Sequence, residues 1–146
     1  MRLFDRMLAV AALSILSASA SAGQPNENFI VRTTMKSPAE VQSRIQAYVR
    51  RMDWIYVGDN TLKKGQVLQV RTCVPALGKL LWSAGMHVAA MAPCGQIGIW
   101  VSDGVTHVSM LHPRFLNVLY PNPSLRQMGD ELLPLLTGML DDAVRQ

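Results

Sequence analysis

A β-hairpin signal in the second half of the chain constrains the fold more than any other feature. The dipeptide Asp103-Gly104 stands between two segments in which apolar residues alternate with others, and Asp-Gly accepts the positive φ angles of a two-residue hairpin turn. Such a turn fixes the register of both strands. The pairs it predicts are Val101 with Thr106, Ile99 with Val108 and Trp100 with His107. We therefore expect an antiparallel pair with one aliphatic face and a Trp100/His107 pair on the other.

Alternation, capping residues and turn residues predict the elements before this hairpin. Ser37 is an expected N-cap, Pro38 the first helical residue, and Glu40 the third position of a capping box. The expected elements are a strand over 28–35, a helix from Pro38 onward, a strand over 54–57, turns at 58–60 and 63–65, and a strand over 66–72. The apolar stripe of the helix, expected in the core, is Val41, Ile45, Tyr48, Val49 and Met52.

The remaining segments predict helices that back the sheet. A short helix is expected from Pro75 to about Gly85, and the apolar segment 86–91 is expected to be a strand or the approach to one. A helical piece over 114–119 precedes a last helix, in which Pro134 should cause a kink or a split. The predicted fold class is therefore α+β, with an antiparallel sheet backed by helices.

The N-terminus predicts export. A basic start, an apolar run from Met7 to Leu16 and small residues up to Ala22 are typical of a secretory signal peptide over 1–22. The mature chain, 23–146, has the length of one α+β domain. No other stretch reaches the roughly 18 to 20 apolar residues of a membrane span. We expect a periplasmic or secreted protein with no membrane span.

The charge pattern argues against a nucleic-acid partner. The chain carries 14 Lys and Arg against 10 Asp and Glu, a net charge of +4, and these charges are scattered along the sequence. Nucleic-acid-binding proteins gather basic residues into a patch or stripe. Together with export, the scatter predicts no nucleic-acid partner.

The two cysteines and the last histidine form the most reactive candidate site. Extending the hairpin register toward its open end places Cys94 opposite Pro113, within one residue of His112 on the adjacent strand. A histidine beside a cysteine stabilises the nucleophilic, metal-binding thiolate. Cys73 precedes the helix opened by Pro75, where the helix dipole favours negative charge. Arg71, two residues before Cys73, is a candidate to anchor an anion.

The standard catalytic and metal-binding motifs are missing from the sequence. It contains no closely spaced CxxC, no HExxH, no P-loop and no GxSxG. The hairpin region also lacks the paired carboxylates of a glycosidase. Any catalysis would therefore depend on cysteine.

The chain resembles the bacterial and archaeal domain-of-unknown-function family 302 in three short motifs. These motifs are a Cys-x-Pro, a later Pro-Cys, and a proline that closes the strand after it. The matching residues are Cys73, Pro75, Pro93, Cys94 and Pro113. The resemblance covers the chain from about Asn28 to the last helix, and it departs at Val74 and Gly95, where the family commonly has Asn and a larger polar residue. It implies a small α+β domain similar to a single copy of the TATA-binding-protein-like fold, often dimeric, and no established activity.

The hypothesis that follows is an exported, non-enzymatic binding domain that forms a homodimer. Its pocket would hold a small ligand, a sulfur species or a soft metal, and the sequence names no cofactor. The pocket residues are Cys73, Cys94 and His112, and Arg71, Trp100 and His107 are further candidate ligand-binding residues. Three alternatives stay open: a thiol-dependent or sulfur-transfer enzyme with Cys94 as nucleophile and His112 as base, a Cu(I) site of thiolate, thioether and imidazole, and a structural Cys73–Cys94 disulfide with function at another surface.

Overall fold

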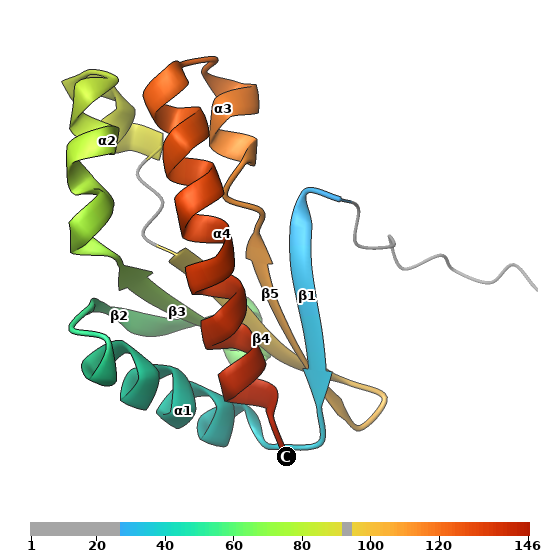
Figure 1. Cartoon of the computed structure of the whole chain (residues 1–146). Helices are drawn as coiled ribbons and strands as arrows, with labels where there is room; N and C mark the ends of the chain where they lie inside the picture. Colours follow the sequence, from blue (N-terminus) through green and yellow to red (C-terminus); the bar gives the residue numbers. More distant parts are fainter. Residues whose placement is uncertain (1–26, 92–94) are drawn as a thin grey trace, which may run out of the picture.

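The computed structural model describes residues 27–91 and 95–146, which fold into a five-stranded antiparallel sheet packed against helices (Figure 1). The sheet order is β1-β5-β4-β3-β2. The strands are β1 (Phe29–Thr34), β2 (Ile55–Leu62), β3 (Val67–Cys73), β4 (Gly95–Ser102) and β5 (Val105–Leu111). The helices are α1 (Pro38–Arg51), α2 (Gly78–Ser83), α3 (Phe115–Leu119) and α4 (Pro123–Val144), with 3-10 helices η1 (Lys63–Gly65), η2 (Pro75–Leu77) and η3 (Met86–Met91). The α+β prediction is confirmed.

The hairpin of β4 and β5 has the predicted register. Trp100 lies opposite His107, and the other two predicted pairs are also present. Asp103 and Gly104 have φ angles of 52° and 75°, the left-handed values that a two-residue turn of this type requires. The turn residues therefore determine how β4 and β5 pair, without help from the rest of the chain.

Helix α1 begins as the capping residues predict. The Ser37 hydroxyl accepts a hydrogen bond from the backbone N–H of Glu40 at 3.2 Å, and Pro38 occupies the first turn. The Glu40 carboxylate forms ion pairs with the Lys36 ammonium at 3.3 Å and with Arg44 Nε at 3.6 Å. The predicted stripe is buried at Val41, Ile45 and Val49, and Tyr48 packs at the edge of the core. Met52 is 40% exposed, so its placement in the core was wrong: it follows the last helical residue as the C-cap.

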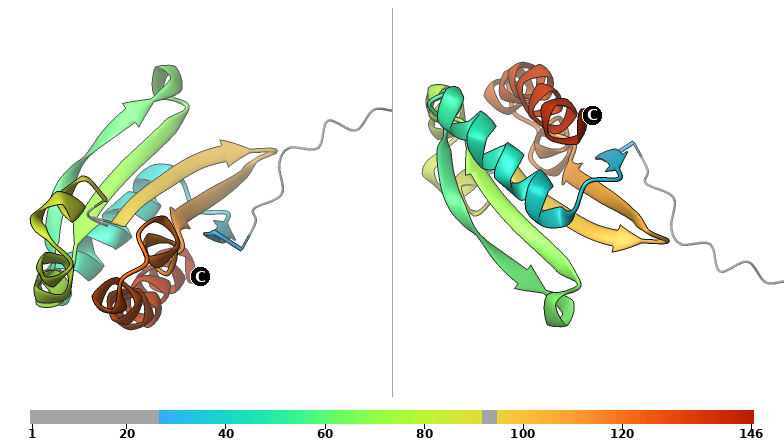
Figure 2. Two further views of the ribbon diagram at one scale, coloured as in Figure 1. Left: turned by 90° about the horizontal axis from the view of Figure 1, so that it is seen from above. Right: turned by 90° about the horizontal axis from the view of Figure 1, so that it is seen from below.

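Helices α1 and α4 cover the same side of the sheet (Figures 1 and 2). Helices α1, α2 and α3 each contact α4, which supplies eight of the buried helical residues. The core between these helices and the sheet contains Ile97, Ile99 and Val108 from the hairpin and Val70 from β3. These alternating positions account for the aliphatic face predicted from the hairpin.

Two local predictions were wrong, and a third was confirmed. Residues 58–60 lie inside β2, where the pairing shifts between Tyr56 and Gly58 and Gly58 takes φ 140°, so the expected turn is a β-bulge. The predicted turn at 63–65 is confirmed: η1 joins β2 to β3 there. The segment Met86–Met91 is a 3-10 helix rather than a strand, and it buries Val88.

Pro134 does not split the last helix. Figure 1 shows α4 as one ribbon, and the helix runs from Pro123 to Val144 with Pro134 inside it. Eight buried residues of α4 pack on the sheet and on neighbouring helices, and this packing holds the helix together although proline lacks one backbone donor. Within the described part of the chain, α4 and the other helices are too short or too polar to cross a membrane.

Candidate functional site

The side of the sheet opposite the helices gathers most of the candidate residues. Side chains that alternate with the core positions point to this side, which we call the open face. It is defined by Val67, Gln69, Arg71 and Cys73 on β3, Gln96, Gly98 and Trp100 on β4, His107, Ser109 and Leu111 on β5, and Phe29, Val31 and Thr33 on β1. Helices α1, α2 and α3 each contact α4, which packs on the other side of the sheet (Figure 2). Arg71, Cys73, Trp100 and His107 therefore share one surface.

Trp100 and His107 form an aromatic stack on the open face. Their ring centroids lie 5.2 Å apart and the two planes differ by 12°. The cross-strand register places them directly opposite each other, and each side chain is half-buried. One face of the indole is thus occupied by His107, which fixes the orientation of the ring.

Arg71 lies two residues from Cys73 on the same face of β3. Its Nε is buried and has no hydrogen-bond partner among the described residues, and none of the ion pairs between described residues includes it. The guanidinium lies over the β-bulge of β2, where a Cβ on Gly58 would be 3.8 Å from Arg71 Nη2. The glycine leaves room for the guanidinium, and the result is a positive charge beside Cys73.

The side chains on the open face between Arg71 and Trp100 are small or polar. Gln69 Nε2 donates a hydrogen bond to Gln96 Oε1 at 3.2 Å across β3 and β4. Gly98 pairs with Gln69 on β3 and with Ser109 on β5, and a Cβ on Gly98 would meet only the Ser109 hydroxyl, at 3.6 Å. On β3, β4 and β5, the row that separates the two ends of the open face therefore consists of Gln69, Gly98 and Ser109.

His112 follows β5 and stays in contact with the edge strand. Its backbone N–H donates to the Asn28 carbonyl at 2.7 Å, and its Nδ1 accepts from the backbone N–H of Arg114 at 3.3 Å. This bond holds the imidazole at the corner between β5 and α3 and leaves Nε2 as the other ring nitrogen. Cys94 lies outside the described residues, so the adjacency of Cys94 and His112 and a Cys73–Cys94 disulfide stay predictions. In the described ranges, no three His, Cys, Asp or Glu side chains are placed to hold a metal ion.

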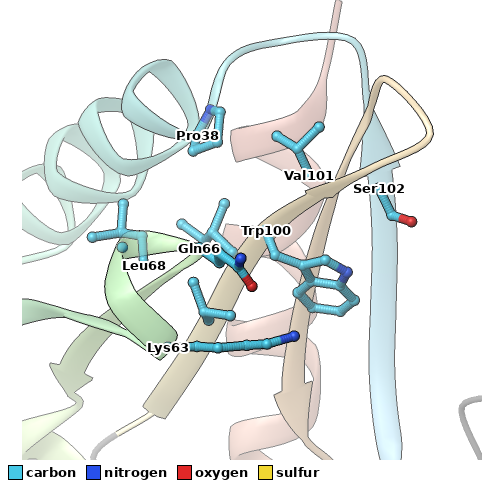
Figure 3. A pocket seen from close by; sticks show the side chains of 10 residues that line it. Pro38, Lys63, Gln66, Leu68, Trp100, Val101 and Ser102 are labelled. Atoms are coloured by element: carbon cyan, nitrogen blue, oxygen red, sulfur yellow. The ribbon is translucent and has the colours of Figure 1, made fainter.

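A groove that the sequence did not predict lies at the opposite end of the sheet from Cys73. It has a volume of about 770 Å³ and opens where β3 begins and β4 continues past it (Figure 3). Its walls come from the start of α1, the η1 turn and both strands: Pro38, Lys63, Gly65, Gln66, Val67, Leu68, Ile99, Trp100, Val101 and Ser102. The turn at 63–65 and Trp100 were each noted in the sequence, but their proximity depends on the pairing of Val67 with Trp100, which no local signal specifies.

A solved structure shares this fold. The crystal structure of the uncharacterized conserved protein DUF302 from Bacillus stearothermophilus superposes with a TM-score of 0.72 and 13% sequence identity, over 82% of this chain and 99% of that chain. At this identity the match shows a common fold, the one that the family resemblance implied. No protein-family model matches the sequence, and no curated protein matches it.

Proposed function

We propose that this chain is an exported binding domain related to family 302, and that it holds a small anionic or sulfur-containing ligand at the Arg71–Cys73 end of the open face. The observation that carries the proposal is the Arg71 guanidinium, which lies beside Cys73 with no ion-pair partner among the described residues. A guanidinium is the side chain best suited to hold a planar or tetrahedral anion. Cysteine sulfur, as at Cys73 next to it, is a ligand type that soft metals prefer.

Cys94 and His112 complete the proposed site. The predicted extension of the hairpin brings Cys94 to the same end of the sheet, and Nε2 of His112 is the ring nitrogen left for a ligand or a metal.

Thiosulfate is a suitable probe because it is both anionic and a sulfur species. We expect the purified protein to bind thiosulfate in calorimetric titrations, and Arg71→Gln to weaken binding about tenfold, the effect of losing one charge-assisted hydrogen bond. Arg50→Gln, an exposed arginine on α1, is the matched control and should bind as the wild type does. An Arg71→Gln variant with unchanged affinity, or a wild type that shows no saturable binding, would overturn the proposal.

The homodimer remains part of the proposal. The exposed apolar side chains Trp82, Met86, Val118 and Leu119 lie on α2, η3 and α3 or directly beside them, at one end of the molecule (Figure 1). His87 links these elements, since its ring contacts the Tyr120 ring edge-on at a centroid distance of 5.2 Å. Self-association through this end would cover apolar surface and leave the open face accessible to a ligand.

A further inference from the structure

We infer that the groove beside Trp100 is a separate binding site for a planar aromatic anion, such as an aromatic carboxylate. This inference goes beyond the proposed function, because the groove lies at the other end of the sheet and contains neither Arg71 nor a cysteine. Its lining combines an aromatic ring, an aliphatic wall and one ammonium group. Each of these three parts is positioned by a different feature of the fold.

The groove exists because β4 is longer than its partner β3. The last pair between these strands is Val67 with Trp100, whereas Val101 and Ser102 pair only with β5. The chain before Val67 turns away as η1, so β4 presents the edge of its last two residues to the groove. Leu68 and Pro38 close the side toward the core and supply aliphatic surface, whereas the Ile99 side chain, which also borders the groove, is fully buried.

The η1 turn directs a cation to this edge. Lys63 and Lys64 have φ angles of 49° and 54°, and Gly65 follows at 86°, so two consecutive lysines adopt the left-handed backbone that L residues rarely take. Figure 3 shows the Lys63 side chain extending along the groove toward the Trp100 indole. None of the ion pairs between described residues includes Lys63, and no lining residue is acidic.

The chemistry of the lining selects the ligand class. Trp100 is held by its stack on His107, and the half-buried indole forms one wall of the groove. A flat aromatic ring gains most from an aromatic and aliphatic wall, and an unneutralised ammonium favours a negative group on that ring. A volume of about 770 Å³ lies within the roughly 300–1,000 Å³ of small-molecule sites and admits a two-ring molecule.

Two naphthalene probes of the same shape test the inference. We expect naphthalene-2-carboxylate to bind about fivefold more tightly than the neutral naphthalene-2-carboxamide in calorimetric titrations, the preference that one partly exposed ion pair provides. Lys63→Met should remove this preference and leave amide binding unchanged. Trp100→Leu should weaken both probes.

Lys64→Met is the matched control, since Lys64 occupies the same turn with the same backbone conformation but does not line the groove. It should keep the fivefold preference. The inference is overturned if the wild type binds neither probe, if it binds both equally, or if Lys63→Met and Lys64→Met behave alike. Circular dichroism of each variant shows whether it is folded, and Lys63→Arg, which keeps the charge, should retain the preference.

Discussion

Two buried threonines in the sheet differ in whether their hydroxyl groups form a hydrogen bond. Thr72 on β3 and Thr106 on β5 are both almost fully buried. The Thr106 hydroxyl donates to the Lys36 carbonyl at 2.6 Å, whereas the Thr72 hydroxyl has no hydrogen-bond partner among the described residues. A buried hydroxyl without a partner costs free energy, and a satisfied one stabilises the fold.

Replacing each threonine by valine should therefore change stability in opposite directions. We expect Thr72→Val to raise the free energy of unfolding by about 1 kcal/mol, because valine has nearly the same shape and nothing to desolvate. Thr106→Val should lower it by about 1 kcal/mol, because it leaves the Lys36 carbonyl without this donor. Urea unfolding of the three proteins measures both differences, and destabilisation by Thr72→Val would show that its hydroxyl is satisfied.

Two glycines of α4 offer a comparison at the scale of a helix. A Cβ on Gly129 would lie 3.0 Å from Arg114 Cα and 3.1 Å from the Pro113 carbonyl oxygen, so this glycine lets α4 approach the corner after β5. A Cβ on Gly138 would meet only the Tyr48 hydroxyl, at 3.4 Å. The neighbours of Gly129 are backbone atoms, which cannot move away easily, whereas the neighbour of Gly138 is the end of a side chain.

Alanine at these positions should have opposite effects. Both substitutions gain helix propensity worth up to about 1 kcal/mol. At Gly129 we expect overpacking against the backbone to exceed that gain and to destabilise the protein by about 1–2 kcal/mol overall. Gly138→Ala should leave stability unchanged or raise it by up to about 1 kcal/mol. Thermal unfolding of the pair is sufficient, and equal shifts for both variants would contradict the close approach at Gly129.

The elements that the sequence predicted well are those fixed by their own residues. Asp103-Gly104 determines the β4–β5 turn, and Ser37 with Pro38 determines the start of α1. The sequence predicted a turn at Gly58 because a glycine followed by two polar residues is typical of turns and also occurs in β-bulges. Only the pairing of β2 with β3 distinguishes the two. The segment 86–91 is apolar without a decisive period, and packing against α2 makes it a 3-10 helix.

The candidate site was only partly accessible to the same reasoning. The pairing of Trp100 with His107 followed from the hairpin register, and the structure adds that the two rings stack. The position of Arg71 over Gly58 required the pairing of β3 with β2, and the groove required the pairing of β3 with β4. In both pairings, the sequence of each segment predicts a strand but does not specify which other strand it will pair with. Sites built between such strands therefore become visible only in the folded chain.

At the scale of the whole molecule, one mass measurement tests processing, assembly and the state of the cysteines together. We expect protein taken from the export compartment to begin at Gly23, as the signal-peptide prediction requires, and to have twice the chain mass under native conditions. Alkylation with and without prior reduction reports the state of Cys73 and Cys94, because a cysteine in a disulfide reacts only after reduction and a bound sulfur species adds mass.

Each part of this measurement has an outcome that contradicts one proposal without affecting the others. A chain that keeps residues 1–22 contradicts export by this signal. A native mass equal to one chain contradicts the homodimer. Two thiols that react only after reduction, with no additional mass, indicate a Cys73–Cys94 disulfide, which would stabilise the fold by about 3 kcal/mol for a loop of this size. In that case the thiols leave the binding site, and Arg71 alone would have to account for thiosulfate binding, which the Arg71→Gln titration measures independently.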